Sequence, residues 1–340
     1  MLSSAGIVDG QKKFGSSYYY FVHQLLYGVL PGVLIFWILS RINYKFWKKL
    51  ALPLLLAAIT LLILVFVPGI GFGLKGAQRW IHLGIFTFQP SEVLKVALVV
   101  YLAAWFSTWN DRQRKWSYSM IPFFVIMGFI WVLFIKQPDV GTLGVITVTA
   151  FSMYFLAGAK IKQILLLIGA ILLILAAVVF TTPYRLDRIT AFLNRAEDPQ
   201  GVSYHINQSL IGIGSGGIFG LGYGQSKQKF NYLPEPVGDS IFSIIGEELG
   251  LVGMTAVIAL FVVLALVMIS VARDAPDVFG RLYVLGIAVW ITSQAFINIA
   301  AISGLIPLTG VPLPFISYGG TSLIALLAGL GIATNIAKHT

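Results

Sequence analysis

Apolar runs of about 20 residues recur along this chain and constrain its fold more than any other feature. A helix needs about that length to cross roughly 30 Å of hydrocarbon, whereas the strands of a membrane barrel give weaker alternations of about ten residues. The runs lie at 18–40, 51–70, 92–108, 117–135, 140–159, 163–182, 239–272 in one or two pieces, 283–303 and 318–337. The sequence therefore predicts an all-α polytopic integral membrane protein with about nine transmembrane helices.

Composition agrees with this prediction. Of the 340 residues, 58% are hydrophobic and only 11% are charged, which is too apolar for a domain with a water-facing surface. The chain has no cysteine, so disulfides and thiolate metal sites are excluded.

Short basic loops alternate with loops of the opposite face and predict the orientation. Five of them hold 12 of the 23 Lys and Arg residues: Arg41, Lys45, Lys48 and Lys49; Arg112, Arg114 and Lys115; Lys160 and Lys162; Arg273 and Arg281; and Lys338. By the positive-inside rule these loops are cytoplasmic. Residues 71–91, 183–238 and 304–317 then face the outside.

Two outer segments are unusual. The segment 183–238 is long for a connection and rich in glycine, which favours a folded functional loop within a single membrane domain over 1–340. The stretch 282–337 carries no charge but contains GLIPLTGVPLPFISYGG, whose prolines and glycines cannot form one continuous helix. Irregular backbone at membrane depth needs protein or a wet cavity around it, so a cavity is expected there.

Ionisable residues at or near the spans are the best indicators of function, because a charge in hydrocarbon is costly unless it is paired or hydrated. These residues are Arg79, Glu92, Lys95, Lys136, Asp139, Asp239, Glu247 and Glu248. Each also has a structural interpretation. Glu92 and Lys95 can form an i,i+3 ion pair, Asp139 can be a first-turn acid, and Asp239 can cap the following helix. Glu247 and Glu248 can pair with backbone of a neighbouring span.

Two other motifs favour structure over chemistry. His82 and His205 are far apart with no third ligand at metal spacing, which does not support a zinc site. GIGSGG follows no strand and precedes no Gly-Lys-Ser/Thr, so we interpret it as a site of close backbone packing.

A family resemblance covers nearly the whole chain. The stretches GAQRWIHLGIFTFQPSEVLK, QPDVGT, QSLIGIGSGGIFGLGYGQSKQKFNYLPEPVGDSIFSIIGEELG and GLIPLTGVPLPFISYGGTSL resemble, in order, the signatures of the SEDS family of bacterial wall synthesis. GQSKQKFNYLPEP and RAEDPQGVSYHINQSL resemble the FtsW and SpoVE branch more than the RodA branch.

The resemblance implies a peptidoglycan glycosyltransferase of the bacterial cytoplasmic membrane, which polymerises lipid II into glycan strands at the outer face, for septal wall synthesis in cell division. It implies Asp239 as the catalytic carboxylate, placed after the long outer loop and before a span. Substrate-binding residues carried over are Arg79, Lys95, Glu92, Asp139 and Gln208. The resemblance also implies a divalent cation, Mg²⁺ or Mn²⁺, and no nucleotide. The implied partners are a class B penicillin-binding protein as transpeptidase and membrane proteins of the divisome or elongasome, with no nucleic acid.

The sequence departs from the family pattern at two points. Val237 and Gly238 stand where the family has His-Thr before the catalytic Asp, so an auxiliary role of that His is absent or moved. The family pattern has ten spans, and this chain is expected to lack the first.

Two alternatives of other classes stay open at this point. Intramembrane charges and broken helices also suit a lipid-precursor flippase or another transporter. However, the chain has no internal repeat, and its charges gather at one face. A noncatalytic scaffold that recruits a synthase is also compatible with the sequence.

Overall fold

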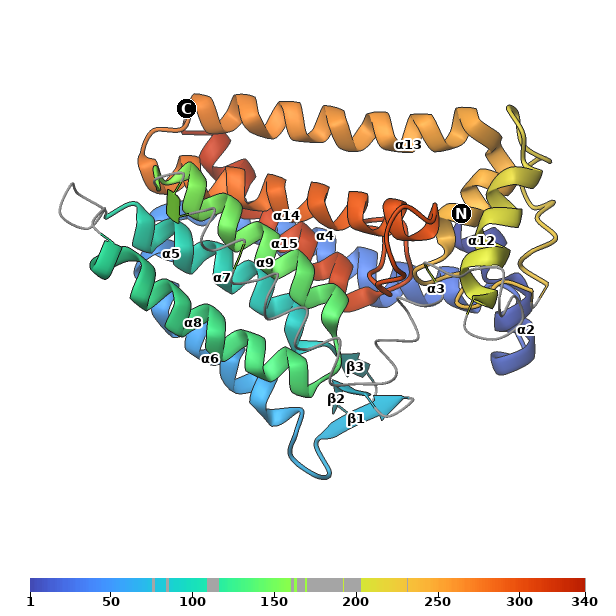
Figure 1. The fold of residues 1–340 in the computed structure, drawn as a ribbon, viewed down its shortest axis with the longest axis horizontal. Coiled ribbons are helices and arrows are strands. Elements are labelled where there is room, and N and C mark those ends of the chain that lie inside the picture. The colour runs from blue at the N-terminus through green and yellow to red at the C-terminus, as the bar shows by residue number, and fades with distance from the viewer. Residues whose placement is uncertain are drawn as a thin grey trace. The chain divides into compact units, whose positions relative to one another are not determined.

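The computed structural model describes residues 1–74, 77–83, 86–108, 116–159, 162–163, 169, 192, 203–230 and 232–339. Most of this part of the chain is helical (Figure 1). The helices are α1 (Leu2–Ala5), α2 (Ile7–Phe14), α3 (Tyr19–Gln24), the π-helix η1 (Leu25–Val29), α4 (Leu30–Leu39), α5 (Tyr44–Lys49), α6 (Ala51–Leu64), α7 (Pro90–Phe106), α8 (Trp116–Lys136), α9 (Val140–Leu156), α12 (Tyr204–Ser215), α13 (Ile241–Arg273), α14 (Val278–Ile302) and α15 (Gly320–Ala337).

The predicted fold class is confirmed, and the chain is a multi-pass membrane protein. In the described residues, helices occupy eight of the nine predicted spans. The remaining predicted span, 163–182, lies outside the described residues except for Gln163 and Gly169. The basic loop 109–115 and residues 183–191 and 193–202 of the long loop also lie outside them. Four helical segments are long and apolar enough to cross a bilayer: Tyr19–Leu39, Ile241–Arg273, Val278–Ile302 and Gly320–Ala337.

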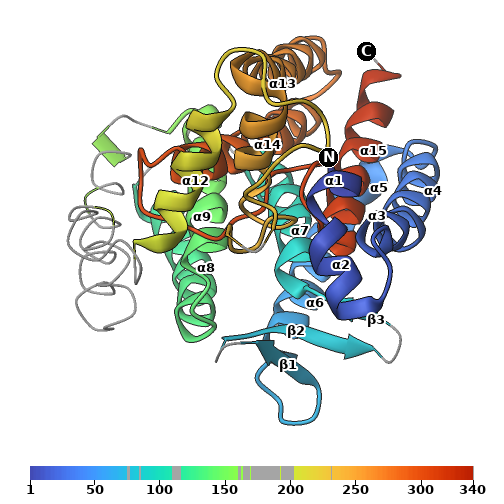
Figure 2. The ribbon, with the colours of Figure 1, turned by 90° about the vertical axis from the view of Figure 1, so that its right-hand side faces the viewer.

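A small sheet connects α6 to α7 and was not predicted (Figure 2). Strands β1 (Gly71–Leu74), β2 (Ala77–Leu83) and β3 (Phe86–Phe88) are antiparallel in the order β1-β2-β3, with Gly71 opposite Ile81 and Ile81 opposite Phe88. The notion of 71–91 as a plain outer connection is therefore incomplete, because Arg79 lies within β2. Trp80 and Ile81 are good strand formers, and alternate side chains of a strand point to opposite faces.

By its contacts the chain forms two compact units, each made of three stretches. The first contains Met1–Pro31, Leu175–Leu264 and Gln294–Leu323, and the second contains Gly32–Ile174, Ala265–Ser293 and Ile324–Thr340. The expectation of a single domain over 1–340 stays a prediction, and each unit is described by itself below.

Glycines bring the helical segment Tyr19–Leu39 and α15 close together. In the first unit, a Cβ on Gly320 would lie 2.9 Å from the carbonyl oxygen of Tyr27. In the second unit, a Cβ on Gly331 would lie 2.8 Å from the carbonyl oxygen of Phe36. Small residues let membrane helices approach until their backbones touch, which replaces the hydrophobic driving force that lipid does not supply.

Residues in or beside three predicted cytoplasmic loops contact one another in the second unit. The buried hydroxyl of Tyr44 donates to Asp277 at 3.0 Å, and the backbone N–H of Tyr44 donates to Asn335 at 2.9 Å. Burial and the hydrogen bond to Asp277 raise the pKa of Tyr44 to about 12. Lys338 Nζ donates to the carbonyl of Ser40 at 3.3 Å. The basic segments at 41–49, 273–281 and 338 therefore lie on one side, as the charge pattern predicts.

Candidate active site

Asp239 lies in the first unit, two residues before α13 begins at Ile241. Its neighbour Ser240, which is completely buried, occupies the position directly before the helix. Asp239 is half-buried as a residue. This position suits a group that must be held by a helix start and meet a substrate.

Three consecutive backbone carbonyls fix the chain at Asp239. The carbonyl of Val237 accepts from the backbone N–H of Tyr318 at 2.8 Å, and that of Gly238 accepts from the hydroxyl of Ser317 at 2.7 Å. The carbonyl of Asp239 accepts from Nδ2 of Asn298 at 2.8 Å. We call Asn298, Ser317 and Tyr318 the carbonyl clamp. All three donors come from the charge-free stretch 282–337, so this stretch holds the segment that carries Asp239.

The clamp is itself held by the irregular segment between α14 and α15. Asn298 Nδ2 also donates to the carbonyl of Val311 at 2.7 Å, and Ser317 Oγ accepts from the backbone N–H of Leu313 at 2.8 Å. Gly304 and Gly310 have φ near +70°, which favours glycine. The prediction that GLIPLTGVPLPFISYGG is not one continuous helix is confirmed.

This irregular segment also borders a pocket, whereas the wet cavity expected from the sequence stays a prediction. The pocket has a volume of about 350 Å³ and a mostly apolar lining that includes Gln24, Ile245, Phe315, Ile316 and Leu323. Asp239 is not part of this lining.

The carboxylate of Asp239 has different surroundings on its two oxygens. The hydroxyl of Ser240 lies 3.4 Å from Oδ1. On the other side, a Cβ placed on the exposed Gly310 would lie 3.7 Å from Oδ2. A side chain at position 310 would therefore contact Oδ2.

Gln208 also lies in the first unit. It is a half-buried residue of α12, three positions after His205, so both side chains project from similar faces of that helix.

Arg79 and Asp139 are brought together in the second unit. Arg79 Nε lies 3.9 Å from Oδ2 of Asp139, and the guanidinium also donates to the carbonyls of Gln137, at 3.5 Å, and Pro138. Asp139 is the N-cap of α9 and accepts from the backbone N–H of Thr142 at 3.3 Å. The expectation that Asp139 is a first-turn acid is therefore wrong by one position, because Asp139 precedes the first turn and caps the helix. Arg79 keeps 31% of its side chain exposed, so it can still reach an anion.

Glu92 and Lys95 form the ion pair that their spacing predicts. Lys95 Nζ lies 2.8 Å from Oε1 of Glu92, and both side chains are at least 96% buried at the start of α7. The ammonium also lies 5.0 Å from the centre of the Trp290 ring, within the range of a cation–π interaction. In the described part of the chain, Oε2 of Glu92 has no hydrogen-bond partner. The pair is therefore buried but incompletely satisfied.

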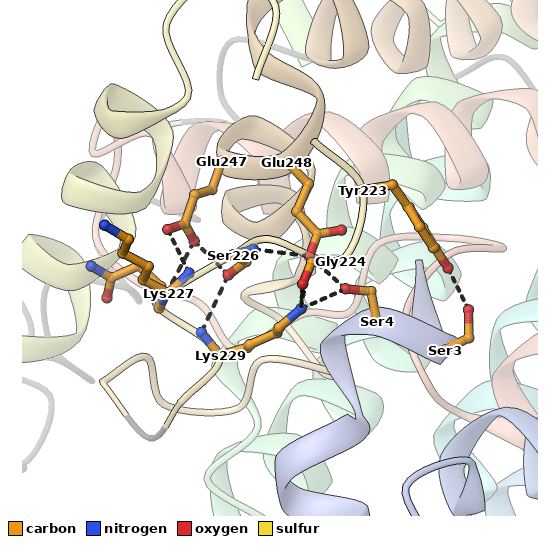
Figure 3. Close-up of polar contacts among 10 residues, drawn as sticks. Ser3, Ser4, Tyr223, Gly224, Ser226, Lys227, Lys229, Glu247 and Glu248 are labelled. Carbon is orange, nitrogen blue, oxygen red and sulfur yellow. Dashed lines mark hydrogen bonds and ion pairs between the residues drawn. The ribbon is translucent and has the colours of Figure 1, made fainter. Parts of the chain in front are cut away.

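Glu247 and Glu248 hold the loop that follows α12 (Figure 3). Glu247 accepts from the hydroxyl of Ser226 at 2.5 Å and from the backbone N–H of Lys227 at 2.8 Å. Glu248 forms an ion pair with Lys229 at 3.2 Å and accepts from the hydroxyl of Ser4 at 2.5 Å. Their partners are loop and N-terminal residues, so the expectation that these acids pair with backbone of a neighbouring span is wrong. The buried Lys229 was missed because a lysine in a loop normally stays in water.

The glycine-rich segment crosses α13 where that helix is broken at Gly250, which has φ 65° and ψ −162°. A continuous helix would pair Leu251 N–H with the Glu247 carbonyl and Val252 N–H with the Glu248 carbonyl. Instead, these N–H groups donate to the carbonyls of Gly217 and Ile218, while the two carbonyls accept from the N–H groups of Leu221 and Gly222. The segment 217–222 thus satisfies all four backbone groups that the break would leave unpaired.

Glycine is required at this crossing. A Cβ on Gly216 would lie 1.9 Å from the carbonyl oxygen of Gly246, and a Cβ on Gly220 would lie 2.2 Å from that of Glu248. The prediction that GIGSGG is a site of close backbone packing is confirmed.

No metal site is formed by protein side chains alone in the described residues, where no group of three or more His, Asp or Glu side chains could hold an ion.

Comparison with known proteins places these features in one family. The FtsW, RodA and SpoVE family of cell cycle proteins matches residues 1–340. A Geobacter sulfurreducens protein named probable peptidoglycan glycosyltransferase FtsW is 42% identical over 339 residues, covering 100% of this chain and 91% of the relative. Stage V sporulation protein E of Bacillus subtilis is 39% identical over 340 residues, covering 100% of this chain and 93% of the relative.

A solved structure has the same fold over nearly its full length. It is a chain described under structural coordination of polymerization and crosslinking by a peptidoglycan synthase complex. The TM-score is 0.80 at 27% identity, and the match covers 99% of this chain and 96% of that chain. With its long apolar helices and an unbroken match over its whole length, the chain belongs to the FtsW, RodA and SpoVE family, as its sequence signatures predict.

Proposed function

We propose that this chain is a peptidoglycan glycosyltransferase that polymerises lipid II into glycan strands at the outer face of the bacterial cytoplasmic membrane, with Asp239 as general base. The observation that carries the proposal is the half-buried residue Asp239, whose backbone is fixed by the carbonyl clamp just before a long apolar helix. The names of the FtsW relatives support the same activity.

The chemistry requires one carboxylate and a site for a leaving diphosphate. Formation of a β-1,4 bond from an α-linked lipid diphosphate inverts the anomeric carbon. Asp239 takes the proton of the acceptor's 4-hydroxyl as its oxygen attacks that carbon, and the diphosphate departs from the opposite face. Arg79 and Lys95 neutralise the negative charge that develops on the diphosphate, and Asp139 and Glu92 orient these two cations. Gln208 completes the proposed substrate-binding set from α12.

A divalent cation, Mg²⁺ or Mn²⁺, is part of the proposal. It would be held chiefly by diphosphate oxygens and would add positive charge beside the leaving group. No nucleotide is required, because the activated donor is already attached to lipid.

A partner supplies crosslinking in this proposal. The peptidoglycan synthase complex among the solved structures combines polymerization with crosslinking. We therefore propose a class B penicillin-binding protein as transpeptidase partner, within a divisome or elongasome assembly. The resemblance to FtsW favours septal wall synthesis during division.

The Asp239→Asn variant tests the catalytic assignment, because an amide of the same shape cannot accept a proton. We expect it to insert and fold normally and to lose polymerisation of purified lipid II by roughly 10²–10⁴-fold, the usual contribution of a general base. Glu235→Gln is a matched control, because Glu235 is an exposed acid four residues earlier in the same segment. EDTA followed by Mg²⁺ in the parent assay tests the cation.

The outcomes separate the competing functions. Polymerisation by Asp239→Asn at the parent rate would show that Asp239 is not the base. Transfer of lipid II across a vesicle bilayer without polymerisation would favour the flippase alternative.

A further inference from the structure

Besides the carbonyl clamp, a series of polar side chains connects α12 to Asp239. His205, the second residue of that helix, lies with Nε2 at 2.6 Å from Oγ of the buried Ser240. The same Oγ lies 3.4 Å from Oδ1 of Asp239 and 2.8 Å from the carbonyl oxygen of Pro234. The imidazole, the hydroxyl and the carboxylate thus form a connected series, although His205 is 35 positions away from Ser240 in the sequence.

The geometry points to His205 and Ser240 as positioning residues for Asp239, an inference that rests on the proposed function and deepens it. With a proton on Nε2, the imidazole donates to Ser240 Oγ. The hydroxyl proton of Ser240 then has the Pro234 carbonyl as its nearer acceptor at 2.8 Å, with Oδ1 of Asp239 at 3.4 Å. In this arrangement the imidazole and the Pro234 carbonyl together hold the Ser240 Oγ beside the carboxylate.

The consequence for catalysis concerns the orientation of the Asp239 carboxylate. Oδ1 lies 3.4 Å from the Ser240 hydroxyl, so a fixed Ser240 side chain limits how the carboxylate can rotate. A catalytic group must be aligned closely with the atom whose proton it takes. Loss of this support should therefore lower the rate of the chemical step strongly and change the affinity for substrate little.

The place of His205 in α12 supports a role in positioning. The hydroxyl of Ser209 donates to the carbonyl of His205 at 2.8 Å, an interaction one turn along the same helix. The helix then continues to Ser215, directly before the glycine crossing of α13. The imidazole is therefore carried by a helix that is itself anchored to the helix of Asp239.

The test compares kcat and KM for lipid II in purified variants. We expect His205→Ala and Ser240→Ala each to lower kcat about tenfold while KM stays within about twofold of the parent. His205→Gln keeps an N–H donor and Ser240→Thr keeps the hydroxyl, so both should recover at least half of the parent kcat. Ser243→Ala is the matched control. Its hydroxyl is equally buried, lies one turn further along α13 and has no hydrogen-bond partner in the described part of the chain.

Three readings separate the outcomes. If the parent polymerises lipid II and the two alanine variants keep the kcat of Ser243→Ala, the positioning inference is wrong and the proposed function stands. A loss confined to KM, or alanine and conservative variants that lose kcat equally, would also overturn the inference. If the parent itself does not polymerise lipid II, the proposed function fails. Thermal unfolding in detergent identifies any variant that is misfolded, and the conservative variants then decide the question.

Discussion

Lys95 and Arg79 are both proposed diphosphate ligands, but their environments differ. Lys95 is almost fully buried, with its charge already balanced by Glu92 at 2.8 Å. Arg79 keeps 31% of its side chain exposed, and its ion pair with Asp139 is long, at 3.9 Å. A buried pair that loses one member leaves an uncompensated charge, which typically costs about 3–5 kcal/mol of stability. Asp139 is itself 7% exposed, but it keeps the hydrogen bond from Thr142 when Arg79 is lost, whereas Glu92 Oε2 has no partner in the described residues.

These differences predict different results for the two alanine variants. Arg79→Ala should lower polymerisation of lipid II about tenfold or more through loss of a charge-assisted contact, with a smaller fall in unfolding temperature than Lys95→Ala. Lys95→Ala should lower the unfolding temperature first, because Glu92 stays buried without its partner. The double variant Glu92→Gln/Lys95→Ala should recover much of that stability. Equal unfolding temperatures for Lys95→Ala and the double variant would contradict this account.

At the scale of elements, α13 and the glycine-rich segment depend on each other. The break at Gly250 is tolerated because residues 217–222 satisfy the freed backbone groups, and Glu247 and Glu248 fix the loop that follows. Since membrane hydrocarbon offers no water to such groups, the break and the crossing segment have to form together.

Alanine substitutions at two glycines of the loop test this coupling, because both positions have nearly the same backbone φ. Gly220 has φ +80° and Gly224 has φ +81°, so alanine costs about 1–2 kcal/mol at either position. A Cβ on Gly220 would also lie 2.2 Å from the carbonyl oxygen of Glu248. A Cβ on Gly224 would have no atom of the described residues within 4 Å, apart from its neighbours in the chain. Gly220→Ala should therefore lower the free energy of unfolding by a further ~1–3 kcal/mol or more, measured in detergent. Equal losses in the two variants would show that the crossing is not tight.

At the scale of the whole molecule, the orientation in the membrane stays a prediction. Its basis is the set of basic segments that meet around Tyr44, Asp277 and Asn335 in the second unit. In the first unit, the hydroxyl of Ser3 lies 2.6 Å from that of Tyr223, so the N-terminal residues lie against the predicted outer loop.

The absence of cysteine makes this orientation directly testable. Gln225 and Asp274 are both exposed and lie in a predicted outer loop and a predicted cytoplasmic loop. In intact cells, Gln225→Cys should react with a membrane-impermeant thiol reagent, and Asp274→Cys should react only after the membrane is opened. The reverse pattern would invert the orientation and place Asp239 inside.

The sequence predicted what depends on local pattern. Apolar runs indicated the helices, the prolines and glycines after Ile302 indicated irregular backbone, and i,i+3 spacing indicated the Glu92–Lys95 pair. It did not predict the sheet, although Gly-bounded runs with Trp80, Ile81 and Phe88 are typical of short strands. The partners of Asp239 were also missed. Asn298 is 59 positions from Asp239, and His205 is 35 positions from Ser240. Their partners are a backbone carbonyl and a serine hydroxyl, which form no recognisable sequence pattern.

The carbonyl clamp has a consequence for how this site can change in evolution or by design. Every amino acid has a main-chain carbonyl, so Asn298, Ser317 and Tyr318 hold residues 237–239 without regard to the side chains there. A protein built in this way can exchange the two residues before Asp239 and keep Asp239 in place, which accounts physically for Val237 and Gly238 where the family pattern has His-Thr. Mutational tolerance should therefore be high at 238 and low at 298 and 317, although the latter are distant in sequence from Asp239.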